Sequence, residues 1–177
     1  MWGWRSSEVS LHRVYIAIGS NMGDRIQNCR EGLRRLQEIS GVRVIRSSSA
    51  YETEPVGEGL EGWFINAVAE AETDLDPVAL VEHLKRIEGE MGREKSRDRS
   101  NRPIDLDLLF YGELLLESKD LIVPHPLLHR RRFVLEPLTE LVPGQIHPGL
   151  GKKVKDLWAD LKDPHQVRRI ETSLWEA

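Results

Sequence analysis

The order of the apolar patterns along the chain is the feature that most constrains its fold. Some apolar runs are short and rich in β-branched residues, as in strands, and others recur at helical spacing. The second helical pattern has clear boundaries, because Asp76 is suited to the N-cap, Pro77 to the first turn and Gly92 to the end. The patterns predict strands at 14–18, 42–51, 63–71 and 105–111, and helices over 26–36 and 77–91.

This order, strand–helix–strand–strand–helix–strand, is typical of the α+β, ferredoxin-like (βαββαβ) arrangement. We therefore expect an antiparallel sheet with two helices on one face. A short strand at 121–123 and further helices over 133–141 and 154–161 are expected as C-terminal additions. We predict one domain over residues 13–162, an N-terminal extension over 1–12 and a C-terminal tail over 163–177 that the pattern does not place.

Composition narrows the possible partners. The chain has 177 residues, of which 31% are charged, and a formal net charge of −4, so broad attraction to nucleic acid is not expected. No apolar run approaches the roughly 18 residues that span a membrane, and no signal peptide is visible. Cys29 is the only cysteine, and its helical spacing predicts a place in the core. We expect a cytoplasmic monomer that binds neither membrane nor nucleic acid.

Two carboxylates lie within the predicted strand at 105–111. Side chains at i and i+2 of a strand point to the same face, so Asp105 and Asp107 are expected side by side. One interpretation is an exposed edge strand with two solvated acids. The other is a bound cation, because like charges this close repel each other. Mg²⁺ commonly takes one or two carboxylates together with substrate phosphates.

Basic residues gather at two places near this strand. The segment 93–102 carries four arginines and a lysine, and Arg130, Arg131 and Arg132 are consecutive. The chain has no P-loop motif, so guanidinium groups would have to neutralise any bound phosphates. A solvated, charged connection is the alternative for the first group. His125 lies between two prolines, which suits either a fixed phosphate or metal contact or simply a shaped loop.

An aromatic and an amide share one face of the third predicted strand. Phe64 and Asn66 are two residues apart, after the loop that contains Thr53, Pro55 and Val56. A ring that stacks and an amide that hydrogen-bonds suit a flat heteroaromatic ligand. Packing in the core is the alternative for Phe64.

Taken together, these segments resemble the 6-hydroxymethyl-7,8-dihydropterin pyrophosphokinase family. The likeness runs from about Val14 to Leu141 and is carried by several motifs in the same order, at 15–21, 51–55, 64–67, 86–88, 102–107 and 123–125. The resemblance implies a ferredoxin-like enzyme of folate biosynthesis that transfers the β,γ-pyrophosphate of ATP to the pterin hydroxymethyl group and releases AMP.

The resemblance also implies roles for individual residues. Asp105 and Asp107 would bind two Mg²⁺ ions and act in catalysis with Arg93 and Arg102, and Asp105 would also lie near the pterin. Contacts to ATP are implied for Glu88, Arg93, Lys95, Arg102, His125 and Arg131. The pterin pocket would be formed by Gly19, Thr53, Pro55, Val56, Phe64, Asn66, Asp105 and Phe133. Either Arg97 or Arg99 would supply a further loop arginine.

Two other classes of function remain open at this stage. A ferredoxin-like nucleic-acid binder would expose aromatic residues on its central strands and present a basic face, and neither is clear here. Another magnesium enzyme, such as a nucleotidyltransferase, would use the same pair of carboxylates. The products distinguish the enzymes, because nucleotide transfer releases pyrophosphate and pyrophosphate transfer releases AMP.

Overall fold

Six of the described strands form one antiparallel sheet, and β6 and β7 pair antiparallel as a separate two-stranded sheet. The computed structural model describes residues 10–92 and 101–176. Within these residues the six-stranded sheet has the order β5-β1-β4-β3-β8, and β2 also pairs with β4. The elements in chain order are β1 (His12–Ser20), α1 (Arg25–Gln37), β2 (Val42–Ser47), β3 (Ala50–Thr53), β4 (Phe64–Thr73), α2 (Pro77–Glu90), β5 (Asp105–Tyr111), β6 (Leu116–Glu117), β7 (Ile122–Val123), the 3₁₀ helix η1 (Leu128–Arg130), α3 (Arg132–Leu141), α4 (Val154–Ala159) and β8 (Val167–Ile170).

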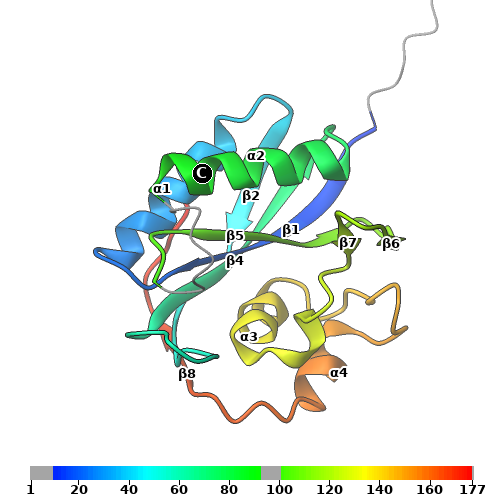
Figure 1. Cartoon of the computed structure of the whole chain (residues 1–177). Helices are drawn as coiled ribbons and strands as arrows, with labels where there is room; N and C mark the ends of the chain where they lie inside the picture. Colours follow the sequence, from blue (N-terminus) through cyan, green and yellow to red (C-terminus); the bar gives the residue numbers. More distant parts are fainter. Residues whose placement is uncertain (1–9, 93–100, 177) are drawn as a thin grey trace, which may run out of the picture.

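Both faces of the sheet are covered. Figure 1 shows α1 and α2 on one side of the strands and α3 and α4 on the other. Buried side chains form two clusters, one of which contains the apolar faces of α1 and α2 and the other those of α3 and α4. The central strand β4 contributes to both clusters, which is why it is buried almost throughout. The C-terminal helices therefore complete a second core.

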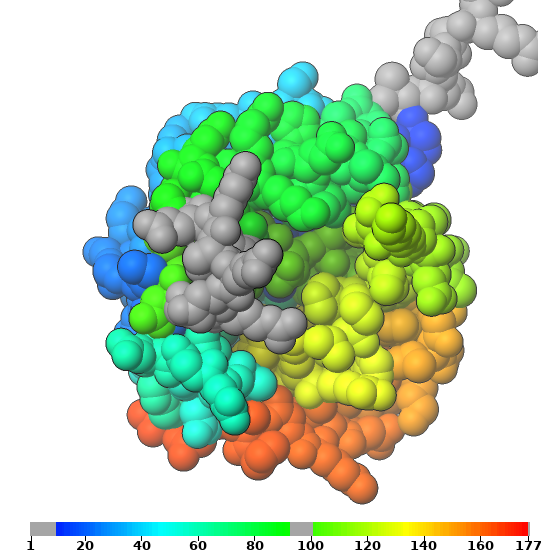
Figure 2. Space-filling view, in the orientation of Figure 1, coloured from blue at the N-terminus to red at the C-terminus, as the bar shows by residue number. Residues whose placement is uncertain are grey.

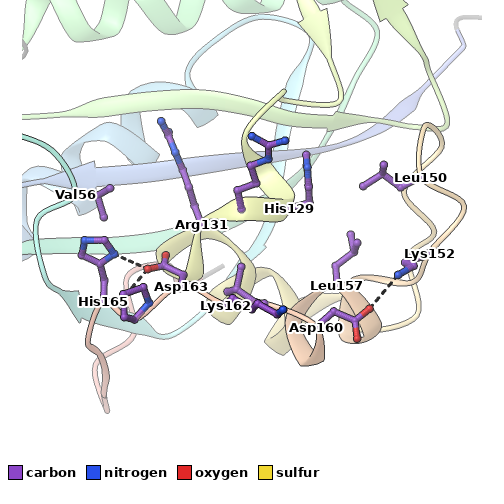
Figure 3. Close-up of a pocket in the computed structure, with 13 residues that line it drawn as sticks. Val56, His129, Arg131, Leu150, Lys152, Leu157, Asp160, Lys162, Asp163 and His165 are labelled. Carbon is purple, nitrogen blue, oxygen red and sulfur yellow. Dashed lines mark hydrogen bonds and ion pairs between the residues drawn. The ribbon is translucent and has the colours of Figure 1, made fainter.

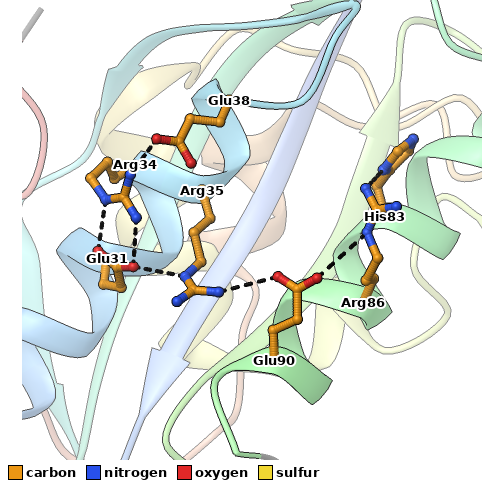
Figure 4. Close-up of polar contacts among 7 residues, drawn as sticks. All are labelled: Glu31, Arg34, Arg35, Glu38, His83, Arg86 and Glu90. Atoms are coloured by element: carbon orange, nitrogen blue, oxygen red, sulfur yellow. Dashed lines mark hydrogen bonds and ion pairs between the residues drawn. The ribbon is translucent and has the colours of Figure 1, made fainter.

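Local sequence rules account for the first two helices. The Asp76 side chain accepts a hydrogen bond from the Ala79 amide at 2.9 Å, and Pro77 follows it, as predicted. The two helices also touch through charged side chains, with Arg35 of α1 3.1 Å from Glu90 of α2 (Figure 4). These contacts are exposed, so apolar packing contributes most of the stability of this layer. Cys29 of α1 is buried in the first cluster, which confirms its predicted place in the core. This burial raises the pKa of its thiol to about 12.

One predicted strand, 42–51, is in fact two. Ser48 lies between β2 and β3, and its hydroxyl accepts a hydrogen bond from the Val68 amide at 3.0 Å. At this point of the ladder, the acceptor for the Val68 amide is therefore the Ser48 hydroxyl and not a backbone carbonyl. The register of β2 against β4 also shifts between Val44 and Arg46. Because the partner is twenty residues away, the apolar pattern of the strand itself did not reveal the break.

The segment after residue 162 returns to the main sheet. Its strand β8 pairs antiparallel with β3, with Val167 opposite Thr53. Farther on, the Leu174 side chain is buried in the cluster of α1 and α2. The division at residue 162 remains a prediction, but the residues beyond it take part in the same sheet and core. Among the described residues, none of the helices is both long and apolar enough to span a bilayer.

Candidate active site

Three neighbouring strands bring the predicted polar residues into one row. Gly19 of β1 lies opposite Asn66 of β4 on one side and Asp105 of β5 on the other, so all three share a face. Asp107 lies opposite Ala17 on the same face. A Cβ at Gly19 would lie 2.5 Å from the Asn66 side-chain oxygen, closer than real side chains pack. Glycine at this position lets the amide and the carboxylate approach from both sides.

This row faces a cavity of about 780 Å³ beside the edge strand β5. Figure 2 shows the surface hollowed between α2 and the segment around α3. Most of the predicted site residues line this cavity: Thr53, Val56, Phe64, Asn66, Glu88, Arg102, Asp105, Asp107, His125, Arg131 and Phe133. Gly19 and Pro55 are not among the lining residues, although Glu54 and Val56 on either side of Pro55 are. Arg93, Lys95, Arg97 and Arg99 lie outside the described residues.

Helix α2 holds the strand that carries the two aspartates. The Glu88 side chain is buried, and its carboxylate accepts a hydrogen bond from the Leu106 amide at 2.8 Å. Leu106 lies between Asp105 and Asp107, so this bond fixes the backbone from which both carboxylates project. Lys85, one turn before Glu88, also lines the cavity. The prediction did not include Lys85, although its spacing from Glu88 on one helix face was a usable signal.

Arg102 is fixed at the start of the same strand. Its Nη1 lies 3.1 Å from Asp105 Oδ2, and its backbone amide donates to Asn21 Oδ1 at 2.7 Å. Among the described residues, no acceptor reaches the buried Nε of Arg102. Asn21 also donates to Asn101 at 2.8 Å, so this one side chain anchors the entry to β5. The sequence prediction missed Asn21 because its partners lie 80 residues away.

His125 and Arg131 line the cavity together with the two aspartates. The His125 amide donates to the Leu109 carbonyl of β5 at 3.0 Å, which fixes the loop against the strand. Burial, together with the charge of Arg131, lowers the pKa of His125 to about 4, against a smaller opposing effect of Asp105. The ring is therefore neutral near pH 7. Its Nδ1 accepts from the Leu127 amide at 3.2 Å, which leaves Nε2 protonated and able to donate.

The other end of the cavity combines aromatic and amide groups. Asn66 is buried, and its Nδ2 donates to Thr53 Oγ1 at 2.6 Å, which orients the amide and turns its oxygen toward Gly19. Phe64 and Phe133 line the same space, and the Arg131 guanidinium lies 5.5 Å from the centre of the Phe133 ring. The cavity therefore has a charged half at β5 and a flat, aromatic half beside β4 and α3.

The side chains of the described residues do not form a metal site by themselves. Within 10–92 and 101–176, no group of three or more His, Cys, Asp or Glu side chains is placed to hold an ion. Asp105 and Asp107 project together from one face of β5 into the cavity, which other carboxylates line from different elements: Glu54, Glu58, Glu88 and Asp120. Such a pair needs further oxygen ligands from water or from a phosphate.

Known proteins resemble this chain over most of its length. A pyrophosphokinase of Bacillus subtilis, named 2-amino-4-hydroxy-6-hydroxymethyldihydropteridine pyrophosphokinase, is 42% identical over 128 residues, which cover 72% of this chain and 77% of that protein. A mitochondrial folate synthesis bifunctional protein of Arabidopsis thaliana is 46% identical over 131 residues, covering 74% of this chain and 24% of that protein. The chain spans between 18% and 28% of the length of several such longer relatives.

Solved structures agree on the fold. A crystal structure of a Plasmodium falciparum HPPK-DHPS variant superposes with a TM-score of 0.69 at 16% identity, covering 87% of this chain and 46% of that one. The sequence profile of one family, described as 7,8-dihydro-6-hydroxymethylpterin-pyrophosphokinase (HPPK), matches residues 15–143. That span includes every strand and helix that lines the cavity. The chain therefore belongs to the 7,8-dihydro-6-hydroxymethylpterin-pyrophosphokinase family.

Proposed function

We propose that this protein transfers the β,γ-pyrophosphate of ATP to the hydroxymethyl group of 6-hydroxymethyl-7,8-dihydropterin and releases AMP. Family membership supports the reaction. The observation that carries the proposal is the divided cavity, in which Asp105 and Asp107 face one half and Phe64, Asn66 and Phe133 line the other. The charged half suits a magnesium-bound polyphosphate, and the aromatic half suits a pterin ring.

We also propose that the enzyme depends on magnesium. Asp105 and Asp107 fit this ion because they supply two oxygen donors on one face and leave the remaining positions to phosphate and water. When bound, two Mg²⁺ ions would neutralise charge on the phosphates and orient them. The Arg102 contact to Asp105 is compatible with this arrangement, because the guanidinium would also reach a phosphate held there.

The remaining residues would position the two substrates. Asn66, oriented by Thr53, would hydrogen-bond the pterin edge while Phe64 and Phe133 stack on its faces. Arg102, Arg131 and the Nε2–H of His125 would contact the triphosphate. The hydroxyl oxygen of the pterin would then attack the β-phosphorus in line with the departing AMP. Asp105, the carboxylate in register with Gly19 and Asn66, is the group best placed to accept the hydroxyl proton.

Product analysis tests the reaction. The protein is incubated with ATP, Mg²⁺ and the pterin, and the nucleotide and pterin products are separated by chromatography. We expect AMP and a pyrophosphorylated pterin in equal amounts. Pyrophosphate release with a nucleotide joined to the substrate would instead identify a nucleotidyltransferase, and the proposed function would be wrong.

The Asp107→Asn substitution tests the metal assignment. It keeps the shape of the side chain and removes its charge, so we expect turnover to fall at least about a hundredfold while the pterin is still bound. Asp156→Asn, at an exposed position of α4, is the matched control and is expected to leave turnover unchanged. Near-normal magnesium-dependent activity of Asp107→Asn would refute the assignment.

Several broader expectations are also proposals. The strand order β5-β1-β4 with β2 and β3 beyond β4 supports a ferredoxin-like arrangement of the sheet. We propose that the domain extends over 13–162, that the protein is a monomer and that it works in the cytoplasm. The Arabidopsis relative is named as mitochondrial, so fluorescence imaging in the native cell is the relevant test of compartment. Light scattering with size exclusion tests the monomer.

A further inference from the structure

A groove of about 640 Å³ lies beside the cavity and shares Val56 and Arg131 with it. Figure 3 shows that Asp163 and His165 border it from the C-terminal segment, next to the base of Arg131. This segment lies beyond residues 15–143, the span that matches the family. The groove therefore marks where a part of the chain outside the family match contacts the substrate-binding walls.

Asp163 makes the central contacts there. Its Oδ2 accepts a hydrogen bond from the Arg132 amide at 2.8 Å, and its Oδ1 accepts from the His165 amide at 3.0 Å and pairs with His165 Nδ1 at 2.5 Å. The Asp163 side chain is 7% exposed. Although burial opposes the change, the hydrogen bonds from Arg132 and His165 lower the pKa of Asp163, so the carboxylate is charged near pH 7.

Helix α3 lacks a cap from its own sequence. Arg131 occupies the N-cap position, and its side chain makes no capping hydrogen bond. The first amides of a helix need acceptors from outside it, and a negative charge there is favourable. Asp163 supplies both, from 31 residues farther along the chain. The end of α3 that it caps carries Arg131 and Phe133, the two residues of this helix end that line the active-site cavity.

The same segment also holds the opposite wall of the groove. Glu54 and Gln166 exchange two hydrogen bonds of 2.9 Å, one through backbone groups and one through the Glu54 carboxylate. Beyond Gln166, Val167 pairs with Thr53 as β8 joins β3. Residues 163–167 therefore contact both the start of the loop that carries Val56 and the start of α3.

We propose that Asp163 is a positioning residue for the pterin: by capping α3, it holds Phe133 in place opposite the β4 wall of the cavity. The proposal rests on the proposed function, because it assigns the pterin to the half of the cavity that Phe133 lines. It also assigns a role to a segment outside residues 15–143, the span that matches the family. The C-terminal segment must contact α3 for the aromatic half of the cavity to keep its shape.

The test compares Asp163→Ala, Asp163→Asn and the control Asp160→Ala. Asp160 lines the same groove but is exposed and pairs only with the exposed Lys152 among the contacts found in the described residues. Pterin affinity is measured by calorimetry with Mg²⁺ and α,β-methylene-ATP, in which the bond that would break is replaced. We expect Asp163→Ala to weaken pterin binding about fivefold, the size of a lost helix cap, and Asp160→Ala to have no effect. Asp163→Asn keeps an acceptor oxygen for Arg132 and should bind nearly as well as the wild type.

Two further measurements separate positioning from general loss of stability. In a Phe133→Ala background, Asp163→Ala should weaken binding little further, because its effect acts through the missing ring. Hydrogen exchange at the Arg132 amide should be faster in Asp163→Ala than in the wild type, whether or not substrates are present. Circular dichroism verifies folding. If Asp163→Ala fails to fold, His165→Ala takes its place: it removes the ring that holds Asp163 Oδ1 and should shift pterin binding and Arg132 exchange in the same directions, whereas wild-type values of both would refute the proposal.

The results that overturn the proposal are distinct. A folded Asp163→Ala with wild-type pterin affinity, or a loss that is fully additive with Phe133→Ala, would refute positioning. Unchanged exchange at the Arg132 amide would refute the cap itself. If the wild type produces no pyrophosphorylated pterin, the proposed function fails, and the exchange experiment still decides whether Asp163 caps α3.

Discussion

The Gly19→Ala substitution tests whether the close approach of the Asn66 side chain to β1 shapes the aromatic half of the cavity. Gly19 lies between Asn66 and Asp105 in the register of three strands. A methyl group there would lie 2.5 Å from Asn66 Oδ1 and 3.8 Å from the Phe64 ring. Since the nearest atom belongs to a buried side chain, the Asn66 amide must rotate or the strands must move apart.

The cost follows from what Asn66 would lose. Rotation of its amide breaks the 2.6 Å hydrogen bond to Thr53, a buried bond whose net value is about 1 kcal/mol. Inserting a methyl group into packed structure costs about 1–3 kcal/mol when the neighbours can shift only partly. Because the amide tip can absorb part of the clash, we expect a total near 2 kcal/mol. For a domain of this size that lowers the melting temperature by about 4–8 °C.

Thermal unfolding and steady-state kinetics measure the two consequences. We expect Gly19→Ala to lower the melting temperature and to raise KM for the pterin, because the displaced Asn66 no longer presents its amide. Gly89→Ala is the matched control. A Cβ at Gly89 of α2 meets no heavy atom within 4 Å, so this change should stabilise the helix by about 0.5–1 kcal/mol and leave pterin KM unchanged.

The reasoning fails if Gly19→Ala unfolds at the wild-type temperature and keeps the wild-type KM. A loss of stability with unchanged pterin KM would show that the strands move while Asn66 stays in place, and the assigned role of Asn66 would then be wrong.

Two further predictions concern the walls of the cavity. The pKa of His125 is lowered to about 4 from an ordinary value near 6.5. Between these two pH values the folded state therefore binds fewer protons than the unfolded state. The free energy of unfolding keeps its full contribution from the neutral ring above pH 6.5 and loses it as pH falls toward 4. Denaturation between pH 7 and 4.5 should therefore show a smaller loss of stability in His125→Gln than in the wild type, and parallel curves would contradict this. Glu88→Ala removes the acceptor of the buried Leu106 amide and should cost about 1–3 kcal/mol in denaturant unfolding, whereas Glu88→Gln should cost less; equal losses in the two variants would show that the acceptor oxygen is not what matters.

Capping rules and strand periodicity predicted the features whose interacting residues lie close together in the sequence. The start of α2 follows from Asp76 and Pro77, since the capping bond spans three residues. The placement of Asp105 and Asp107 on one face of β5 follows from strand geometry alone. The aromatic and amide pair at Phe64 and Asn66 follows in the same way. Each of these features depends on a single element, so periodicity is enough to predict it.

Features that join distant segments were beyond such rules. Asn21 fixes Arg102 from 81 residues away, and Asp163 caps α3 from 31 residues beyond its start. The break at Ser48 also depends on a partner in another strand. Asparagine, serine and aspartate are frequent in turns, so their local sequence gives no sign of a distant partner. The distant backbone amides that these side chains bind are known only once the strand register and the position of the C-terminal tail are known.

The position of β5 explains why several site residues also support the fold. This strand is an edge of the described sheet, and an apolar edge strand exposes backbone groups that invite pairing with another chain. Glu88 accepts from the Leu106 amide, and the His125 amide donates to the Leu109 carbonyl, so both close part of this edge. The same two side chains line the cavity. Loss of activity on removing the Glu88 carboxylate therefore mixes binding with edge protection. The edge contact of His125 is made by its backbone amide and survives substitution of the ring, and Asp107 projects from the face of the strand. For this reason Asp107→Asn, rather than Glu88→Ala, is the informative test of the chemistry.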